Sequence, residues 1–277
     1  MIFTFKAWED FCRLLKEENI QSVTAEEVLT GAFKAPYLVL KHDVETAPLS
    51  ALKMAEIEAA FGHKASYYVQ AYLMQDEKNV PIFKKMQALG HEISYHYDCL
   101  DSAGGDLDKA IEEFTANKDL FFKNGFRFKT VCQHGNPVVE RVGYTSNRDL
   151  FRSDKVQKLY GDMADIMVDF KEKSKTDYKY YSDAGRKFNL IYDPVNNDII
   201  NSDDKNIPYK NLKEVKNAIG ENNAIISSHP HRYTKSAAKY VIKTAIFKIV
   251  RILAKAFAKI PVFKKIMSKY YYLAKKI

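Results

Sequence analysis

Hydrophobic residues along this chain alternate between helical spacing and short runs typical of buried strands. Four times, a segment with apolar residues at helical spacing ends at a glycine and is followed by such a run. The predicted helix and strand pairs cover residues 50–61 and 65–69, 79–89 and 92–96, 106–122 and 128–132, and 209–219 and 224–228. Because helices alternate with strands, the pattern predicts a parallel sheet with helical crossovers.

Other elements complete this α/β pattern. A helix is predicted over 6–17, and the capping-box spacing of Thr24 and Glu27 predicts a short helix through Leu29. The apolar run from Tyr37 predicts the first long strand, and further strands are predicted at 166–170 and 178–181. About seven strands favour a distorted (β/α)7-type parallel barrel. An open doubly wound sheet stays an alternative, since no glycine-rich nucleotide loop decides the matter.

The last part of the chain differs in charge from the rest. The 277 residues carry a net charge of +8, yet no acidic residue follows Glu221, and thirteen Lys or Arg lie between Arg232 and Lys276. Residues 1–221 therefore carry a net charge of −5. We expect N-terminal helices over 1–34 that pack on the barrel, a barrel over 35–235, and a basic amphipathic helical tail over 236–277.

Within the tail, residues 241–260 place apolar side chains on one helical face and basic side chains on the other. Pro261 ends or kinks this helix, and a second basic and aromatic segment follows. The helix could pack on the barrel or lie on an anionic membrane surface through residues 241–277. We expect no nucleic acid as a partner, because no recognition motif accompanies the charge.

Composition indicates a cytoplasmic protein, at the inner face of the membrane if the tail binds there. Cys12, Cys99 and Cys132 are widely spaced and unpaired in pattern, which is typical of reduced thiols. The first ten residues lack the apolar core of a secretory signal, and no run of 18 apolar residues occurs.

Polar residues gather where the predicted strands end. Asp43 and Glu45 are two residues apart and would point to the same side, as metal ligands or as a structural salt-bridge cluster. His42, His96, His134 and His229 fall at or just past strand ends, with His231 close by; Asp98 and Asp183 add carboxylates. His63 and His91 follow helix-ending glycines and are predicted to be structural. Imidazole and carboxylate together suit a divalent ion such as zinc.

Several segments resemble the NodB-type polysaccharide deacetylases (carbohydrate esterase family four), over about residues 35–235. These segments are residues 42–45, 90–96 and 228–230. A divergent branch of the family, associated with surface-polysaccharide biosynthesis, is similar at residues 132–137, 181–186 and 229–233. The resemblance implies metal-dependent removal of an acetyl group from a sugar or lipid-linked saccharide. It implies Asp43 as general base and His229 as general acid, with Asp183, Arg186 and Arg232 tuning His229 or binding substrate.

The chain departs from the family pattern at two ligand positions, where Val44 and Leu100 stand. A rebuilt site would use Glu45 or Asp43 with His96 and His134, and Asp98 is another candidate for the third ligand. Loss of the metal would leave a carbohydrate-binding or membrane-surface scaffold protein. Hydrolysis of a different carbon–nitrogen bond, such as that of a cyclic amide, is a third possibility.

Overall fold

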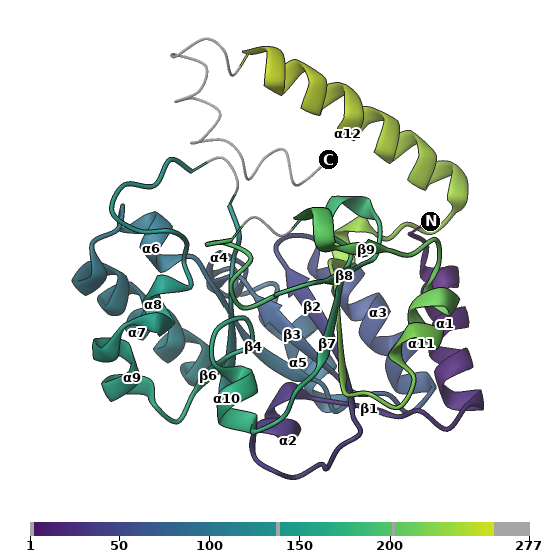
Figure 1. Cartoon of the computed structure of the whole chain (residues 1–277), viewed down its shortest axis with the longest axis horizontal. Helices are drawn as coiled ribbons and strands as arrows, with labels where there is room; N and C mark the ends of the chain where they lie inside the picture. Colours follow the sequence, from purple (N-terminus) through teal and green to yellow (C-terminus); the bar gives the residue numbers. More distant parts are fainter. Residues whose placement is uncertain (1–2, 137–138, 201–202, 258–277) are drawn as a thin grey trace.

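A computed structural model describes residues 3–136, 139–200 and 203–257 of the chain (Figure 1). Within these residues, one ten-stranded sheet organises the molecule, in the order β6-β5-β4-β3-β2-β10-β7-β8-β9, with β1 pairing with β2. Neighbouring strands from β6 to β7 run parallel, while β8 and β9 continue antiparallel. The protein is therefore a mixed α/β fold with a mostly parallel sheet.

The strands are β1 (Ser22–Val23), β2 (Leu38–Val44), β3 (Ala65–Val69), β4 (Glu92–Tyr97), β5 (Thr130–Gln133), β6 (Ala164–Asp165), β7 (Lys179–Ser182), β8 (Asn189–Ile191), β9 (Ile207–Pro208) and β10 (Ala224–Ser228). The α-helices are α1 (Phe5–Glu17), α2 (Ala25–Leu29), α3 (Pro48–Ala60), α4 (Ala71–Gln75), α5 (Val80–Ala88), α6 (Cys99–Ser102), α7 (Leu107–Lys123), α8 (Asp149–Arg152), α9 (Asp154–Tyr160), α10 (Phe170–Ser174), α11 (Leu212–Ile219) and α12 (Ala237–Phe257). Short 3-10 turns are η1 (Ala184–Arg186), η2 (Asp203–Lys205) and η3 (Pro230–Arg232).

The predicted alternation of helix, glycine and strand is confirmed. Each of the four predicted pairs is present, as α3 with β3, α5 with β4, α7 with β5 and α11 with β10. Gly62 and Gly90 end their helices with φ of 82° and 94°, a conformation that favours glycine. The capping box is also present, since Thr24 and Glu27 each accept a hydrogen bond from the other's backbone N–H.

The predicted strand at 166–170 is wrong. The strand ends at Asp165, whose side chain accepts a hydrogen bond from the backbone N–H of Met167 at 2.6 Å. The backbone N–H of Asp169 then donates to the Asp165 carbonyl at 3.1 Å, and helix α10 begins at Phe170. A local turn around the aspartate therefore replaces the apolar strand. The antiparallel pair β8 and β9 was not expected from the sequence.

The strands carry different side chains toward their two faces. On the outer face, Leu38, Leu40 and Val44 of β2 join a large cluster with the helices, including Trp8 of α1 and Met54 of α3. Figure 1 shows α1, α3 and α11 on one flank of the strands and α7, α8 and α9 on the other. The opposite face packs in a second cluster, which contains Val39, Tyr68, Cys132, Tyr180 and Ile225. β2 is buried on both faces, as a central parallel strand must be.

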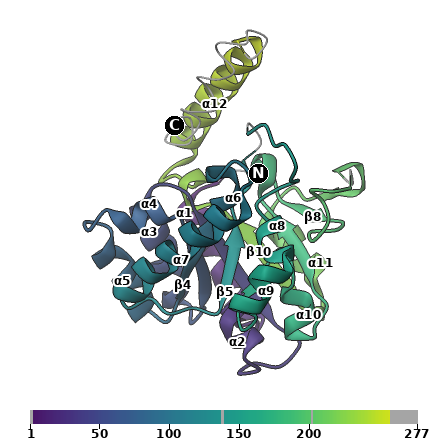
Figure 2. The same ribbon diagram turned by 90° about the vertical axis from the view of Figure 1, so that its left-hand side faces the viewer.

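Helix α12 begins at Ala237, four residues earlier than the predicted helix over 241–260. Its last predicted residues, Pro261 and the basic and aromatic segment lie outside the described residues. Figure 2 shows α12 extending away from the domain. Among the helices described, none combines the length and the apolar character needed to cross a bilayer.

Candidate functional site

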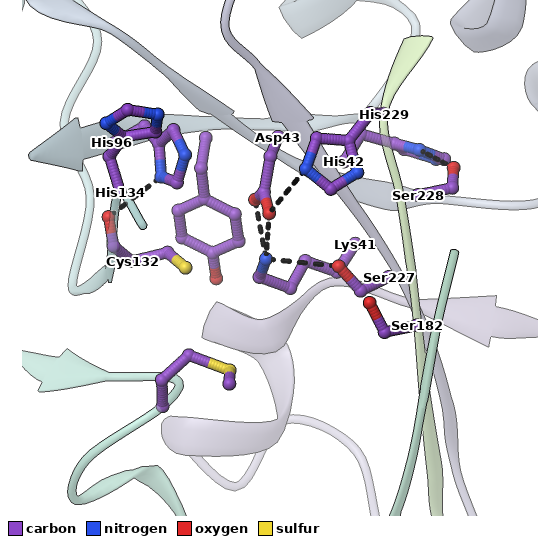
Figure 3. Close-up of polar contacts among 12 residues, drawn as sticks. Lys41, His42, Asp43, His96, Cys132, His134, Ser182, Ser227, Ser228 and His229 are labelled. Carbon is purple, nitrogen blue, oxygen red and sulfur yellow. Dashed lines mark hydrogen bonds and ion pairs between the residues drawn. The ribbon is translucent and has the colours of Figure 1, made fainter. Parts of the chain in front are cut away.

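The face of the sheet that carries the second cluster, which we call the inner face, bears polar side chains where the strands end. Lys41 and Asp43 alternate with outward residues along β2, and Glu45 directly follows the strand. His96 lies in β4, His134 follows β5 and His229 follows β10. Because the neighbouring parallel strands end at the same edge, the side chains of Lys41, Asp43, His96, His134 and His229 meet there (Figure 3). Glu45 adjoins them through His134 and His229. The prediction that His96, His134 and His229 lie at strand ends is confirmed.

Lys41 and Asp43 form a buried ion pair at the centre of this group. The Lys41 Nζ atom lies 2.5 and 2.6 Å from the two Asp43 carboxylate oxygens, and the lysine is 1% exposed. It also donates to the Ser227 hydroxyl at 3.3 Å. Burial alone would raise the pKa of Asp43, but Lys41, His96 and His229 outweigh it and lower that pKa. Asp43 is therefore held ionised.

Glu45, His96 and His134 form a buried group whose potential ligand atoms all lie within 4.8 Å of one another. The His134 Nε2 atom is 3.2 Å from the Glu45 carboxylate, and the His96 and His134 rings lie edge to face with centroids 5.2 Å apart. These are the residues that the sequence suggested as a rebuilt ligand set.

The chemistry of His96 fits a ligand role. Its Nδ1 atom lies 3.0 Å from the Cys132 carbonyl oxygen, so Nδ1 carries the proton and the Nε2 lone pair is the one that can bind a metal. Burial lowers the pKa of His96 to about 4, so the imidazole is neutral at pH 7. Two imidazoles and one carboxylate suit zinc and similar divalent ions. The donor set of this group therefore fits a divalent metal.

A second group joins Asp43, His96 and Cys132, whose potential ligand atoms also lie within 4.8 Å of one another. It is a poorer candidate, because burial raises the pKa of the Cys132 thiol well above its usual range and only the thiolate binds metals well. Asp43 is in addition already bound to Lys41. Cys132 could have been assigned to the inner face from the sequence, since it lies two residues before His134.

Asp183 orients the His229 ring through its Nδ1 atom. The Asp183 carboxylate lies 2.6 Å from His229 Nδ1, accepts from the His229 backbone N–H at 3.0 Å, and contacts Arg232 Nη1 at 2.6 Å. Burial would raise the pKa of Asp183, but Arg232 and His229 hold it well below its usual range. The other ring nitrogen, Nε2, is 3.8 Å from Asp43 and 3.9 Å from Glu45. His229 therefore points its Nε2 atom at the two carboxylates.

His42 does not join this group, which corrects the expectation that it lies on the rim with the other strand-end histidines. It points outward from β2, where Nδ1 lies 2.9 Å from the Ser228 hydroxyl and Nε2 lies 2.8 Å from Glu58. Glu58 also accepts from Trp8 Nε1 at 2.9 Å and from the Tyr67 hydroxyl at 2.6 Å. All three members of the Ser228, His42 and Glu58 chain are 0% exposed, so this arrangement of nucleophile, imidazole and carboxylate has no access to substrate.

His63 and His91 are structural, as predicted. The Nε2 atom of His63 lies 2.9 Å from the Cys12 carbonyl, and that of His91 lies 3.0 Å from the Ala55 carbonyl. Both side chains tie helices to strand starts, far along the strands from the polar edge.

The remaining predicted residues border the group. The Asp98 carboxylate lies 3.7 Å from His134 Nδ1 and is 42% exposed, so it flanks the group of Glu45, His96 and His134. Arg186 Nη1 donates to the Thr244 hydroxyl of α12 at 3.5 Å. Arg232 binds Asp183, including its carbonyl oxygen, and this contact makes it a partner of Asp183.

A pocket of 460 Å³ begins at Thr46, the residue after Glu45. Its lining includes Thr46, Tyr72, Asp76, His231 and Lys243, and the Tyr72 hydroxyl donates to the Glu45 carbonyl. Burial lowers the pKa of His231 to about 3, so this imidazole is neutral at pH 7. Lys41, Tyr72 and Lys243 were not among the predicted site residues. A larger pocket of 750 Å³ lies between α1 and α11, and neither of these two pockets is lined by Asp43, Glu45, His96, His134 or His229. No protein-family model matches this chain, and no curated protein sequence matches it.

Proposed function

We propose that this chain is a metal-dependent hydrolase that removes an acetyl group from a sugar. The observation that carries the proposal is the meeting of two units at one strand edge. One is the buried group of Glu45, His96 and His134, and the other is the pair of Asp183 and His229. Asp43 lies between them, held in its charged form by Lys41. A metal group, a charged carboxylate and an oriented imidazole are the parts that hydrolysis of an amide or ester needs.

Glu45, His96 and His134 would hold the divalent ion, zinc in the first instance. A zinc ion there would polarise the acetyl carbonyl and acidify a water molecule. Asp43, ionised and 3.8 Å from His229 Nε2, would accept the proton of the attacking water. Asp183 fixes one proton on His229 Nδ1 and would stabilise the imidazolium that forms when Nε2 takes up a second proton, which Nε2 would then pass to the departing amine or alcohol. The pairing of Asp183 with Arg232 keeps that carboxylate charged throughout.

The adjoining pocket supplies a place for the sugar. Tyr72 is 42% exposed there and offers a ring face on which a sugar can stack, while Asp76 and Asn79 offer polar groups. Lys243 brings a positive charge to the same wall. The pocket is therefore suited to a polar saccharide.

We further propose that the mostly parallel sheet closes into a distorted barrel. The second cluster supports this, because it joins side chains of β2, β3, β5, β7 and β10, together with residues of α2 and α10. The Tyr178 hydroxyl, just before β7, also donates to the Ile166 carbonyl just after β6 at 3.1 Å. Side chains thus bring the two ends of the parallel run together, as closure into a barrel requires.

Metal analysis and acetate release test the proposal together. The protein would be assayed on N-acetylglucosamine oligomers and on O-acetylated xylan, with zinc content measured on the same samples. We expect one zinc per chain in the wild type, loss of zinc in His96→Ala, and retained zinc with acetate release lowered about 10²–10⁴-fold in Asp43→Asn. His63→Ala is the control, because it removes a buried histidine away from the site; circular dichroism would verify folding. A wild type without divalent metal, together with variants that match it in acetate release, would overturn the proposal.

A non-catalytic sugar-binding protein is the second candidate. The short contacts of both Asp43 oxygens with Lys41 favour it, since a carboxylate so paired is a weak base. This candidate predicts no acetate release by the wild type and sugar binding that survives Asp43→Asn. Isothermal titration with the same oligomers separates the two candidates.

A further inference from the structure

Helix α12 attaches to the domain along one side of its first turns. Tyr240 is 7% exposed and packs its ring 5.9 Å from that of Phe3. The Lys243 ammonium donates to the His231 carbonyl at 3.0 Å, and Thr244 accepts from Arg186. These positions are three and four residues apart, so they share one face of the helix. Beyond them the helix leaves the domain (Figure 2).

The other side of the same turns is apolar and open to solvent. Val241, Ile242, Ile246 and Ile249 are 59%, 60%, 43% and 57% exposed. Ile242, Ile246 and Ile249 are spaced by four and three residues, so they form one stripe along the helix. Exposed aliphatic side chains in a stripe of this kind mark a surface that binds something apolar.

The charged residues around the stripe indicate what kind of surface it binds. Lys239 and Lys248 on the same helix are exposed, and the sequence after Glu221 contains thirteen basic residues and no acidic one. An apolar stripe flanked only by positive charge matches an anionic lipid surface, in which the stripe enters the acyl region and the lysines meet the headgroups. A nucleic-acid backbone would satisfy the lysines and leave the isoleucines in water.

We propose that α12 docks this protein on an anionic membrane surface, with Ile242, Ile246 and Ile249 inserted and Lys239 and Lys248 at the headgroups. The docking stands independently of the proposed hydrolysis. It would also orient the candidate site, because α12 begins eight residues after His229, and Lys243 of α12 lines the same pocket as Thr46, the residue after Glu45. If the proposed hydrolysis also holds, the pocket faces a leaflet and the substrate is a lipid-linked saccharide.

Sedimentation of the full chain with vesicles tests the docking. Vesicles of phosphatidylcholine alone are compared with vesicles of phosphatidylcholine mixed with phosphatidylglycerol. We expect binding to the anionic vesicles that is tighter by about 30-fold or more, and that weakens as salt is added. The triple variant Ile242→Ser, Ile246→Ser, Ile249→Ser should lose this binding, whereas Ile199→Ser and Ile207→Ser, matched exposed isoleucines elsewhere, should keep it. Lys239→Gln with Lys248→Gln should weaken binding by about 30-fold, since each lysine contributes about 5-fold.

Two results would overturn the docking: equal affinity for both kinds of vesicle, or full binding by the triple isoleucine variant. If instead the wild type bound no vesicles but bound a DNA duplex tightly, and the triple variant kept that binding, the basic residues would serve nucleic-acid binding and the docking would be overturned. Asp43→Asn should bind vesicles as the wild type does. Failure of the docking is thereby distinguishable from failure of the proposed hydrolysis, which the acetate assay reports.

Discussion

Replacing Lys41 by methionine should destabilise the protein strongly and in a pH-dependent way. The lysine is 1% exposed and contacts both oxygens of Asp43, so Lys41→Met leaves a buried carboxylate without its cation. Breaking a buried pair by removing one partner costs about 3–5 kcal/mol of unfolding free energy. For a chain of this size the melting temperature should fall by about 10 °C.

The sign of the pH dependence follows from the two pKa values of Asp43. In the wild type its pKa is lowered in the folded state, so the pair stabilises above the ordinary carboxyl pKa, and the stabilisation is lost as pH falls through the lowered value. Without Lys41, burial would raise the folded pKa. The destabilisation of Lys41→Met should then be greatest at pH 8 and shrink as pH falls and the buried carboxyl is protonated.

Urea unfolding followed by circular dichroism at pH 8 and pH 5 measures these effects. Wild type, Lys41→Met, Asp43→Asn and the double variant form a double-mutant cycle. The double variant buries no unpaired charge. We therefore expect its loss of unfolding free energy to be smaller, by about 2 kcal/mol, than the sum of the losses in the two single variants. Lys53→Met, at an exposed lysine, should change stability by less than about 0.5 kcal/mol. A loss below about 1 kcal/mol in Lys41→Met, or strict additivity in the cycle, would refute the reasoning.

Three further predictions concern other buried carboxyl groups. Asp183→Asn should lower acetate release about 10²-fold or more with little change in zinc content, because His229 loses the partner that fixes its proton; steady-state kinetics and metal analysis of one sample check it. Glu58→Gln should lower the unfolding free energy by about 2 kcal/mol or more, since Trp8 and Tyr67 donate to this buried carboxylate, while activity per folded molecule stays unchanged. Burial raises the pKa of Glu92 from 4.5 to about 7, so the wild type should lose stability relative to Glu92→Gln as pH rises from about 4.5 to about 7, measured by urea unfolding.

Much of the fold could be predicted because the helices and strands have different hydrophobic periods. Helix α3 and strand β3, separated by Gly62, are an example in which period and glycine together locate both elements. The strand expected at 166–170 shows the limit of this reasoning. There a single side chain, Asp165, hydrogen-bonds to the backbone N–H of Met167 and turns the chain, and periodicity does not record such a bond.

The candidate site could be predicted in part. The strand-end rule brought His96, His134 and His229 together, because it depends only on where strands stop. It misplaced His42, since strand neighbours point to opposite faces and His42 adjoins the inward Asp43. The role of Lys41 was hidden for a different reason. A lysine inside a buried strand is paired only by the geometry of the folded state, and the sequence shows just its spacing from Asp43.

The same alternation also places Val44 and Leu100, the two positions at which the sequence departs from the family pattern that it resembles. Val44 lies on the outer face of β2 and packs in the cluster with the helices, so in this register no side chain at that position could reach the polar group. Glu45, one residue further, returns to the inner side and lies 3.2 Å from His134. Leu100 likewise packs in the outer cluster as part of α6. The positions of Val44 and Leu100 are therefore compatible with the proposed ligand set of Glu45, His96 and His134, because both side chains pack away from it.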